Sequence, residues 1–345
     1  MDYRSYEVEG VIYALMPTAK NLIGVKGLGN KLILMKMSIR KDLEELKVDF
    51  SSYREYDLEG VTNLVLEDWE EGVQWKYSYS SDSNSTLKHN PYQFCIWEED
   101  KLVSGFHIDN SFKVHKLNGN LLMSICHHAG LVTCVAAASF LFSGSMDTSI
   151  VSWSNFLSDS AKAKPYNLYL GHTEAIKQLS VSGNYQVLVS LSNDGTVLLH
   201  DIRSAECLKK LFGKSENPCK FISISEMGFV ACSIYPDVIR IFSINGSEFR
   251  DIHIDQDELH NVHDMQFNKT GENLLIGTNN AVGFYDIFEE NIKAFKRVCE
   301  NIITVVYPTG QEFLIFAINK DTTSVIYTLE TSAKDARRLM IRSGA

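Results

Sequence analysis

The stretch SGSMDTSIVSW, from Ser143 to Trp153, decides the fold because it recurs along the chain. It reads as a strand that ends in small residues, followed by an aspartate, a tight turn and a second strand. The stretches SGFHIDNSFKV (104–114) and VSLSNDGTVLLHDI (189–202) follow the same template. Their β-branched and aromatic segments, bounded by Gly, Asn, Asp and Pro, indicate strands rather than helices. The sequence therefore predicts a repetitive, all-β chain.

The repeat has a period of about forty residues, which is typical of WD-repeat β-propellers, where each repeat supplies four antiparallel strands. A marker residue lies six positions after each template aspartate, and weaker copies extend the series. Successive markers are 38, 47, 42, 43 and 42 residues apart. They are His115, Trp153, His200, Phe242, Tyr285 and Tyr327.

A degenerate copy before the first marker completes the series. It is NLIGVKGLGNKLILMKM (21–37), which places a first, degenerate blade at about 11–60 and brings the count to seven repeats. We therefore predict an all-β, seven-bladed WD-repeat β-propeller that occupies 1–331 as a single domain. Polar segments predict loops at 77–91 and 154–165.

Composition and charge limit the classes of function. The 345 residues are 45% hydrophobic with a formal net charge of −10, which argues against binding to nucleic acid by charge alone. Seven cysteines without a C-x-x-C spacing favour reduced thiols in the cytoplasm. The apolar run at 131–142 is too short to span a bilayer, so no direct membrane insertion is expected. The last residues, 332–345, predict a short C-terminal helical tail.

A His–Ser–Asp combination occurs twice, which raises the question of catalysis. Active sites are rarely repeated from blade to blade, whereas every blade must tie the loop before its first strand to the turn between its second and third strands. An aspartate can accept hydrogen bonds from a histidine and from the backbone. The histidine can donate to a serine that also accepts from an indole N–H. The predicted structural network comprises His128, Ser143, Asp147 and Trp153 in one blade and His172, Ser190, Asp194 and His200 in the next.

Other repeats fill the aspartate position differently. Asp109, Asn279 and Asp321 occupy it in three repeats, and Pro236 occupies it in a fourth. The blades of Pro236 and Asn279 are expected to rely on packing rather than on the full polar network.

Catalytic and metal sites are disfavoured. A Ser-His-Asp hydrolase would need a serine on an exposed, strained turn, and the chain has no G-x-S-x-G elbow. A metal site in CHHAGLVTC (126–134) is disfavoured because His128 aligns with His172 as a repeat position. We predict no catalytic residue, no cofactor and no metal. A propeller hydrolase that uses paired carboxylates stays open as an alternative.

The quoted repeats resemble the C-terminal propeller of BEACH-domain proteins of the neurobeachin, beige and lysosomal-trafficking-regulator kind. The resemblance lies in LVSGFHIDNSFKVHKLNGNLL (102–122), HHAGLVTCVA (127–136) and the segment from GHTEAIKQL to AECLKKL (171–211), and is strongest over 92–287. It implies a non-catalytic interaction scaffold in vesicle trafficking, lysosomal sorting or autophagy. A BEACH domain, in cis or in trans, is an implied partner.

The loop face of the propeller is expected to bind other proteins. The chain would then be cytoplasmic and peripheral to endomembranes through those partners. An alternative is a substrate receptor of a cullin-RING ubiquitin ligase, because TVLLHDIR (196–203) resembles the W-D-x-R box that docks the ligase adaptor. Asp201 and Arg203 match that box, whereas His200 replaces its tryptophan. A solvated Asp–Arg pair would look the same in sequence.

Overall fold

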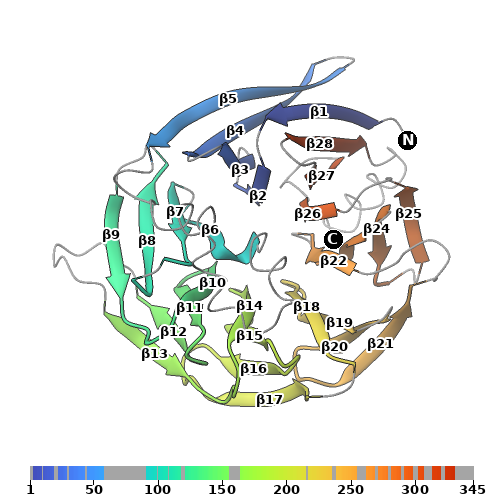
Figure 1. The fold of residues 1–345 in the computed structure, drawn as a ribbon. Helices are drawn as coiled ribbons and strands as arrows, with labels where there is room; N and C mark the ends of the chain where they lie inside the picture. Colours follow the sequence, from blue (N-terminus) through green and yellow to red (C-terminus); the bar gives the residue numbers. More distant parts are fainter. Residues whose placement is uncertain are drawn as a thin grey trace.

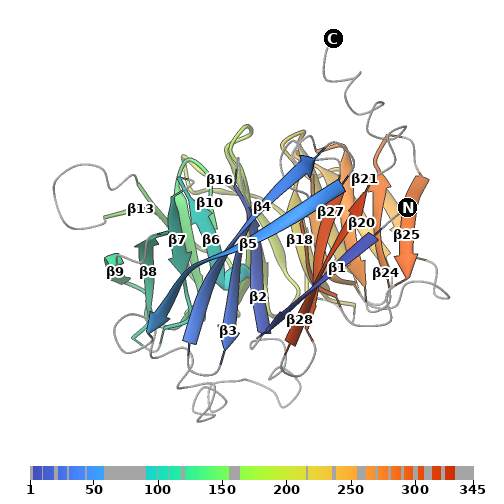
Figure 2. The ribbon, with the colours of Figure 1, turned by 90° about the horizontal axis from the view of Figure 1, so that it is seen from above.

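The strands of the described residues form seven four-stranded antiparallel sheets around a common axis (Figure 1). The computed structural model describes residues 3–9, 11–18, 22–28, 31–42, 45–57, 91–98, 100–107, 109–117, 121–154, 164–214, 217–234, 238–254, 262–268, 271–278, 281–288, 291–297, 302–306, 313–319 and 323–330. Figure 2 shows the ring from its edge, with the sheets standing side by side. We term each sheet a blade and name it by its strands.

The first four blades follow one another along the chain, and in each the strands are ordered from the axis outwards. They consist of β2 (Val11–Pro17), β3 (Leu22–Leu28), β4 (Lys31–Asp42) and β5 (Glu45–Asp57); β6 (Phe94–Trp97), β7 (Lys101–Ser104), β8 (Ser111–Lys116) and β9 (Leu121–Cys126), preceded by the 3-10 turn η2 (Pro91–Gln93); β10 (Val132–Ala137), β11 (Leu141–Ser145), β12 (Ile150–Trp153) and β13 (Pro165–Tyr169); and β14 (Ile176–Ser182), β15 (Val187–Ser192), β16 (Val197–Asp201) and β17 (Cys207–Phe212).

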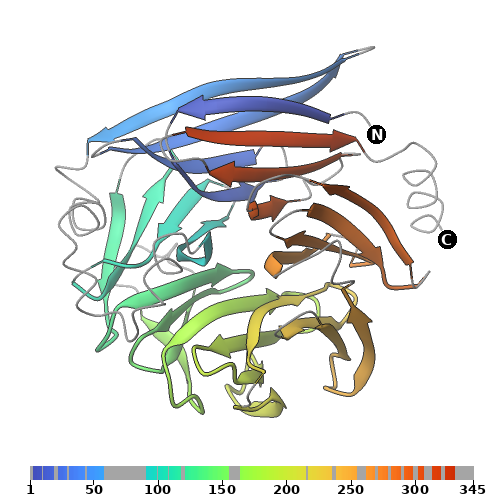
Figure 3. The same cartoon turned by 45° about the vertical axis from the view of Figure 1, so that its right-hand side comes forward.

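The remaining blades complete the ring, and the last one combines strands from both ends of the chain. They consist of β18 (Cys219–Ile224), β19 (Phe229–Ile234), β20 (Val238–Ser243) and β21 (Glu248–His253); β22 (Val262–Phe267), β23 (Asn273–Thr278), β24 (Ala281–Asp286) and β25 (Asn291–Arg297); and β26 (Ile302–Val306), β27 (Phe313–Asn319), β28 (Thr323–Glu330) and β1 (Tyr3–Glu9). Figure 3 shows β1 lying along β28.

The predicted all-β propeller is confirmed by this architecture. The marker residues of the repeat fall in the third strand from the axis, for example Trp153 in β12 and His200 in β16. Pro165, predicted to be in a loop, is instead the first residue of β13, where it pairs with Trp153. Pro91 of the other predicted loop begins η2.

Several sequence predictions concern positions outside the described residues. They are the helical tail at 332–345, the loop at 77–90, the centre of the loop at 155–163, and the aspartate positions Pro236, Asn279 and Asp321. In the part of the chain that the structure describes, no helix combines the length and the hydrophobicity that crossing a membrane requires.

The core lies between the blades, because both faces of a middle strand are covered by neighbouring sheets. Strands β11, β15 and β23 are buried along their whole length, whereas most residues of the outer strand β17 are exposed. In the part of the chain that the structure describes, the buried residues of each apolar cluster come from two neighbouring blades. One cluster joins Phe112 of β8 to Leu141 and Trp153 of the next blade, and the Phe112 and Trp153 rings meet edge to face at 5.2 Å.

Polar side chains connect the innermost strands of adjacent blades. The Gln178 amide of β14 donates to Ile222 O at 2.6 Å and accepts from Ile222 N at 3.0 Å. Ser223 of β18 accepts from Phe267 N of β22 at 3.0 Å. These bonds satisfy backbone groups that face a different sheet, so they fix how one blade sits against the next.

Candidate functional site

The structure brings His128, Ser143, Asp147 and Trp153 together in the β10–β13 blade. His128 Nδ1 lies 3.2 Å from Asp147 Oδ2, and His128 Nε2 lies 2.8 Å from Ser143 Oγ. The Trp153 indole N–H donates to the same Ser143 oxygen at 2.9 Å. Ser149 Oγ is a further neighbour of His128 Nδ1, at 3.0 Å.

The aspartate is positioned by the turn between β11 and β12. Asp147 Oδ1 accepts from the backbone N–H of Ser149 at 2.9 Å and from its hydroxyl at 2.6 Å, which closes the turn locally. Thr148 takes a positive φ of 74° in this turn. Asp147 Oδ2 accepts from Ala129 N at 2.8 Å, so one carboxylate joins the turn to the loop that precedes β10.

The protonation states set the direction of the bonds. Burial lowers the pKa of His128, and the Asp147 carboxylate only partly opposes that shift, so the ring is neutral at pH 7. Burial acts to raise the pKa of Asp147, but the hydrogen bonds from Ser149 lower it overall. An ionised carboxylate only accepts, so the single ring proton belongs on Nδ1, and Nε2 accepts from the Ser143 hydroxyl. This direction is opposite to the one expected from the sequence.

The β14–β17 blade brings together only part of the second set. Ser190 Oγ lies 2.7 Å from His172 Nε2 and 3.2 Å from His200 Nε2. Asp194 instead accepts from Thr196 N at 3.0 Å. No hydrogen bond joins Asp194 to His172 among the described residues, and His172 Nδ1 and His200 Nδ1 are buried there without a hydrogen-bond partner. Burial lowers the pKa of both histidines to about 4.

The β6–β9 blade contains a variant of the network that the sequence interpretation missed. Asp109 accepts from Ser111 N at 3.1 Å and from Ser111 Oγ at 2.5 Å, as the other turn aspartates do. Ser104 occupies the position of Ser143, and its partner is His107 Nε2 at 3.1 Å. This histidine comes from the turn itself rather than from the preceding loop. The only sequence signal was a histidine two residues before the repeat aspartate.

Ser143 is poorly placed to act as a nucleophile. A nucleophile must contact its substrate, but Ser143 is 0% exposed and its hydroxyl accepts a hydrogen bond from the buried Trp153 indole. The network therefore resembles a catalytic triad in connectivity but not in access.

The two cysteines of CHHAGLVTC (126–134) lie in different environments. Cys134 is buried among apolar side chains, and burial raises its pKa to about 12. Cys126 is exposed and its thiol donates to Asp109 O at 3.0 Å. Within the described ranges, no group of three or more His, Cys, Asp or Glu side chains has the geometry to hold a metal ion.

The segment 196–203, which resembles the W-D-x-R box, ends in a turn that the Asp201 side chain stabilises. Asp201 Oδ1 accepts from Arg203 N at 2.8 Å and from Ser204 N at 2.7 Å. The Arg203 side chain is exposed beside it.

Comparison with known proteins agrees with this architecture. The family model described as WD domain, G-beta repeat, matches residues 119–154 and 163–201. BEACH domain-containing protein B of Arabidopsis thaliana is 26% identical over 258 residues, which cover 67% of this chain and 10% of that protein. WD repeat-containing protein 18 of Bos taurus is 32% identical over 124 residues, 32% of this chain and 29% of that protein. The chain thus carries WD40 repeats in a β-propeller fold.

Proposed function

We propose that this chain is a non-catalytic scaffold that binds other proteins through its loop face. By loop face we mean the side of the ring that carries the loop before β10 and the β11–β12 turn. The proposal is based on one observation: the polar side chains of the network form their hydrogen bonds with one another and with the backbone. His128, Asp147 and Ser143 satisfy one another and the backbone, which fixes the loop before β10 against the β11–β12 turn. Fixed loops lose little conformational entropy on binding, which favours docking of a partner.

We further propose a role in vesicle trafficking, lysosomal sorting or autophagy. The similarity to BEACH domain-containing protein B supports this role, together with the repeats quoted for the resemblance. The chain spans only a tenth of that relative, so a BEACH domain would act as a partner in cis or in trans. The protein would be cytoplasmic and would reach endomembranes through such partners.

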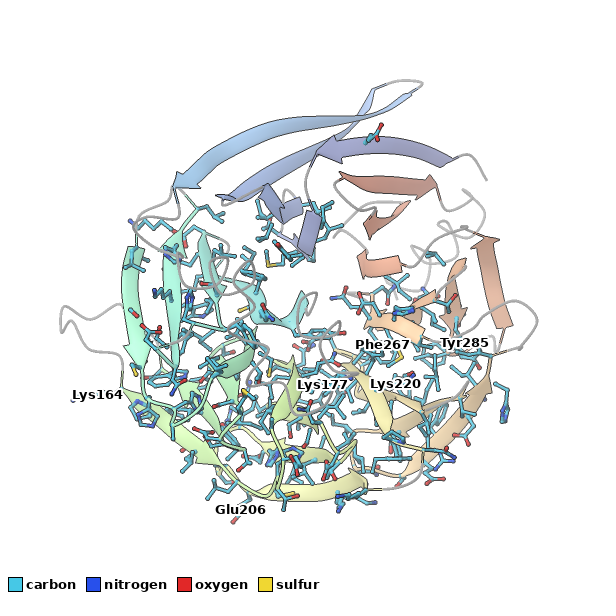
Figure 4. All side chains as sticks on the ribbon, in the orientation of Figure 1. Lys164, Lys177, Glu206, Lys220, Phe267 and Tyr285 are labelled. Atoms are coloured by element: carbon cyan, nitrogen blue, oxygen red, sulfur yellow. The ribbon has the colours of Figure 1, made fainter. Side chains whose placement is uncertain are left out.

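Affinity capture from cytosol tests the scaffold. Glu174 is exposed in the loop between β13 and β14, and Glu206 is exposed at the outer edge of the same blade, where Figure 4 labels it. We expect the wild-type chain to capture trafficking proteins, Glu174→Arg to lose them, and Glu206→Arg, with the same change in charge, to keep them. Recovery of chaperones alone from the wild-type chain would contradict the proposal.

A ligase adaptor is a second candidate partner. The exposed Arg203 favours it, because Asp201 closes its own turn and leaves the guanidinium accessible. Co-purification with the adaptor that disappears in Arg203→Ala would support this role. Absence of the adaptor from wild-type preparations would dismiss it.

A further inference from the structure

Most innermost strands share an irregularity close to their first residue. Each of them skips one residue in its pairing with the second strand, as in a β-bulge, and a bulge re-aims the side chain that leaves the ladder. The skipped residues of the blades with described side chains at this position are Tyr13, Thr133, Lys177, Lys220 and His263.

Three consecutive blades place basic residue types at this position. Lys177, Lys220 and His263 are the second residues of β14, β18 and β22, and all three side chains are partly exposed. Figure 4 shows Lys177 and Lys220 at neighbouring inner strand ends, close to the propeller axis. Recurring bulges therefore gather these side chains on adjacent blades, although they are more than forty residues apart in sequence.

The Lys177 side chain contacts the backbone of Lys220 directly. Lys177 Nζ donates to the carbonyl oxygen of Lys220 at 2.8 Å and lies 5.0 Å from the centre of the Phe221 ring. Burial lowers the pKa of Lys177 to about 8, and the charge of Lys220 contributes in the same direction. An anionic group bound beside Lys177 would offset both effects, because it stabilises the charged form of the ammonium group.

The lysines lie on the loop face. Lys177 lies two residues after Ala175, whose carbonyl oxygen accepts from Asn193 N of the β15–β16 turn at 2.9 Å.

We propose that the Lys177–Lys220 pair docks an acidic segment of a partner protein, with Asp or Glu carboxylates accepting hydrogen bonds from the two ammonium groups. This inference rests on the proposed scaffold function and names the chemistry of its partner. The net charge of −10 adds specificity, because an acidic segment is repelled by most of the surface and attracted at this pair.

Fluorescence anisotropy with a labelled peptide of alternating glutamate and glycine tests the inference. We expect saturable binding to the full chain, no binding of the glutamine–glycine counterpart, and affinity that falls with salt. Lys177→Gln and Lys220→Gln should each weaken binding by about tenfold. Lys209→Gln is the matched control, because Lys209 is exposed on β17, the outer strand of the Lys177 blade.

The melting temperature of each variant separates binding from folding. A purely structural Lys177 would lose stability in Lys177→Gln without a change in peptide affinity, and that result would overturn the inference. The double variant combines Lys177→Gln with Lys220→Gln. If it bound the glutamate peptide as tightly as the wild-type chain, or if the wild-type chain did not bind the peptide, the inference would also be overturned. If the double variant still captures the trafficking proteins of the wild-type chain, the scaffold function stands and only the docking chemistry fails.

Discussion

Asp147 and Asp194 occupy the same place in consecutive blades, but their carboxylates have different partners. Asp147 accepts from two backbone N–H groups on separate segments and also faces His128. Asp194 accepts from Thr196 N within its own turn. One aspartate therefore joins two segments, whereas the other shapes a single turn. The repeat motif alone does not distinguish these two uses.

This difference predicts unequal losses of stability. Asp147→Ala should lower the free energy of unfolding by about 2–3 kcal/mol, because it removes the acceptor of two backbone N–H groups and of the His128 ring. Asp194→Ala should cost about 1 kcal/mol, as loss of a single local cap does. Urea denaturation of both variants measures the two values. Equal losses, or an enzymatic activity abolished in Asp147→Ala without loss of stability, would contradict the structural role.

Buried histidines predict loss of stability in acid. Burial lowers the pKa of His172 and His200 to about 4, while an unfolded histidine titrates near 6.5. The unfolded chain therefore binds more protons below pH 6.5, so this contribution is complete above about pH 6.5 and is lost as the pH falls towards 4. Each pKa unit corresponds to about 1.4 kcal/mol.

A variant with one titrating group fewer tests this linkage. His200→Phe should reduce the slope of unfolding free energy against pH between about 6.5 and 4, whatever it does to stability at pH 8. Equal slopes for His200→Phe and the wild-type chain would show that His200 does not carry the effect.

At the level of elements, the turns between β-strands also pack against the next blade. Gly195 lies in the β15–β16 turn with a φ of +79°, and an added Cβ would lie 2.6 Å from the Pro218 Cβ atom. Pro218 precedes β18, so this glycine permits a close approach between two blades. Gly183, in the β14–β15 turn, has room for a Cβ, which would lie 4.0 Å from its nearest neighbour, an ordinary van der Waals distance.

Alanine substitutions at these glycines form a matched pair. Gly195→Ala should destabilise the protein by about 2 kcal/mol, because it combines a positive φ with a clash against backbone atoms. Gly183→Ala should change stability by less than about 0.5 kcal/mol. Thermal melts of the two variants compare them directly. A similar effect at both positions would rule out the packing explanation for Gly195.

The sequence predicted the elements better than it predicted their contacts. The forty-residue period placed Trp153 and His200 in third strands, because local alternation of residue types specifies strands and turns. The pairing of Ser104 with His107 was missed because a histidine inside a turn breaks the repeat order. Contacts between blades, such as the Gln178 amide on Ile222, depend on three-dimensional stacking that no local pattern encodes.

At the scale of the whole molecule, the ring is held by a blade made from both ends of the chain. β1 pairs with β28 along seven residues, from Tyr3 with Leu329 to Glu9 with Thr323. This outer strand completes the β26–β28 sheet, whose innermost strand β26 contacts β2 and β22. The last blade is therefore the place where the ring is closed by hydrogen bonds rather than by the covalent chain.

Removal of the closing strand should weaken the entire ring. A variant without residues 1–9 loses the β1–β28 ladder, so we expect the unfolding free energy to fall by about 3 kcal/mol or more. Glu7→Gln keeps the ladder and serves as control, since Glu7 is exposed. Chemical denaturation measures both. An unchanged midpoint for the shortened variant would mean that the ring does not depend on this strand.

The same closing strand imposes an order on folding. Blades such as β14–β17 are formed by neighbouring segments and can assemble as soon as their strands have left the ribosome. β1 is synthesised before β28 and must remain unpaired until β28 emerges, and such long-range pairing is intrinsically slow. While the strands between β1 and β28 are being made, the nascent chain therefore exposes a free strand that is open to mispairing, and it is during this interval that the protein would depend most on chaperones.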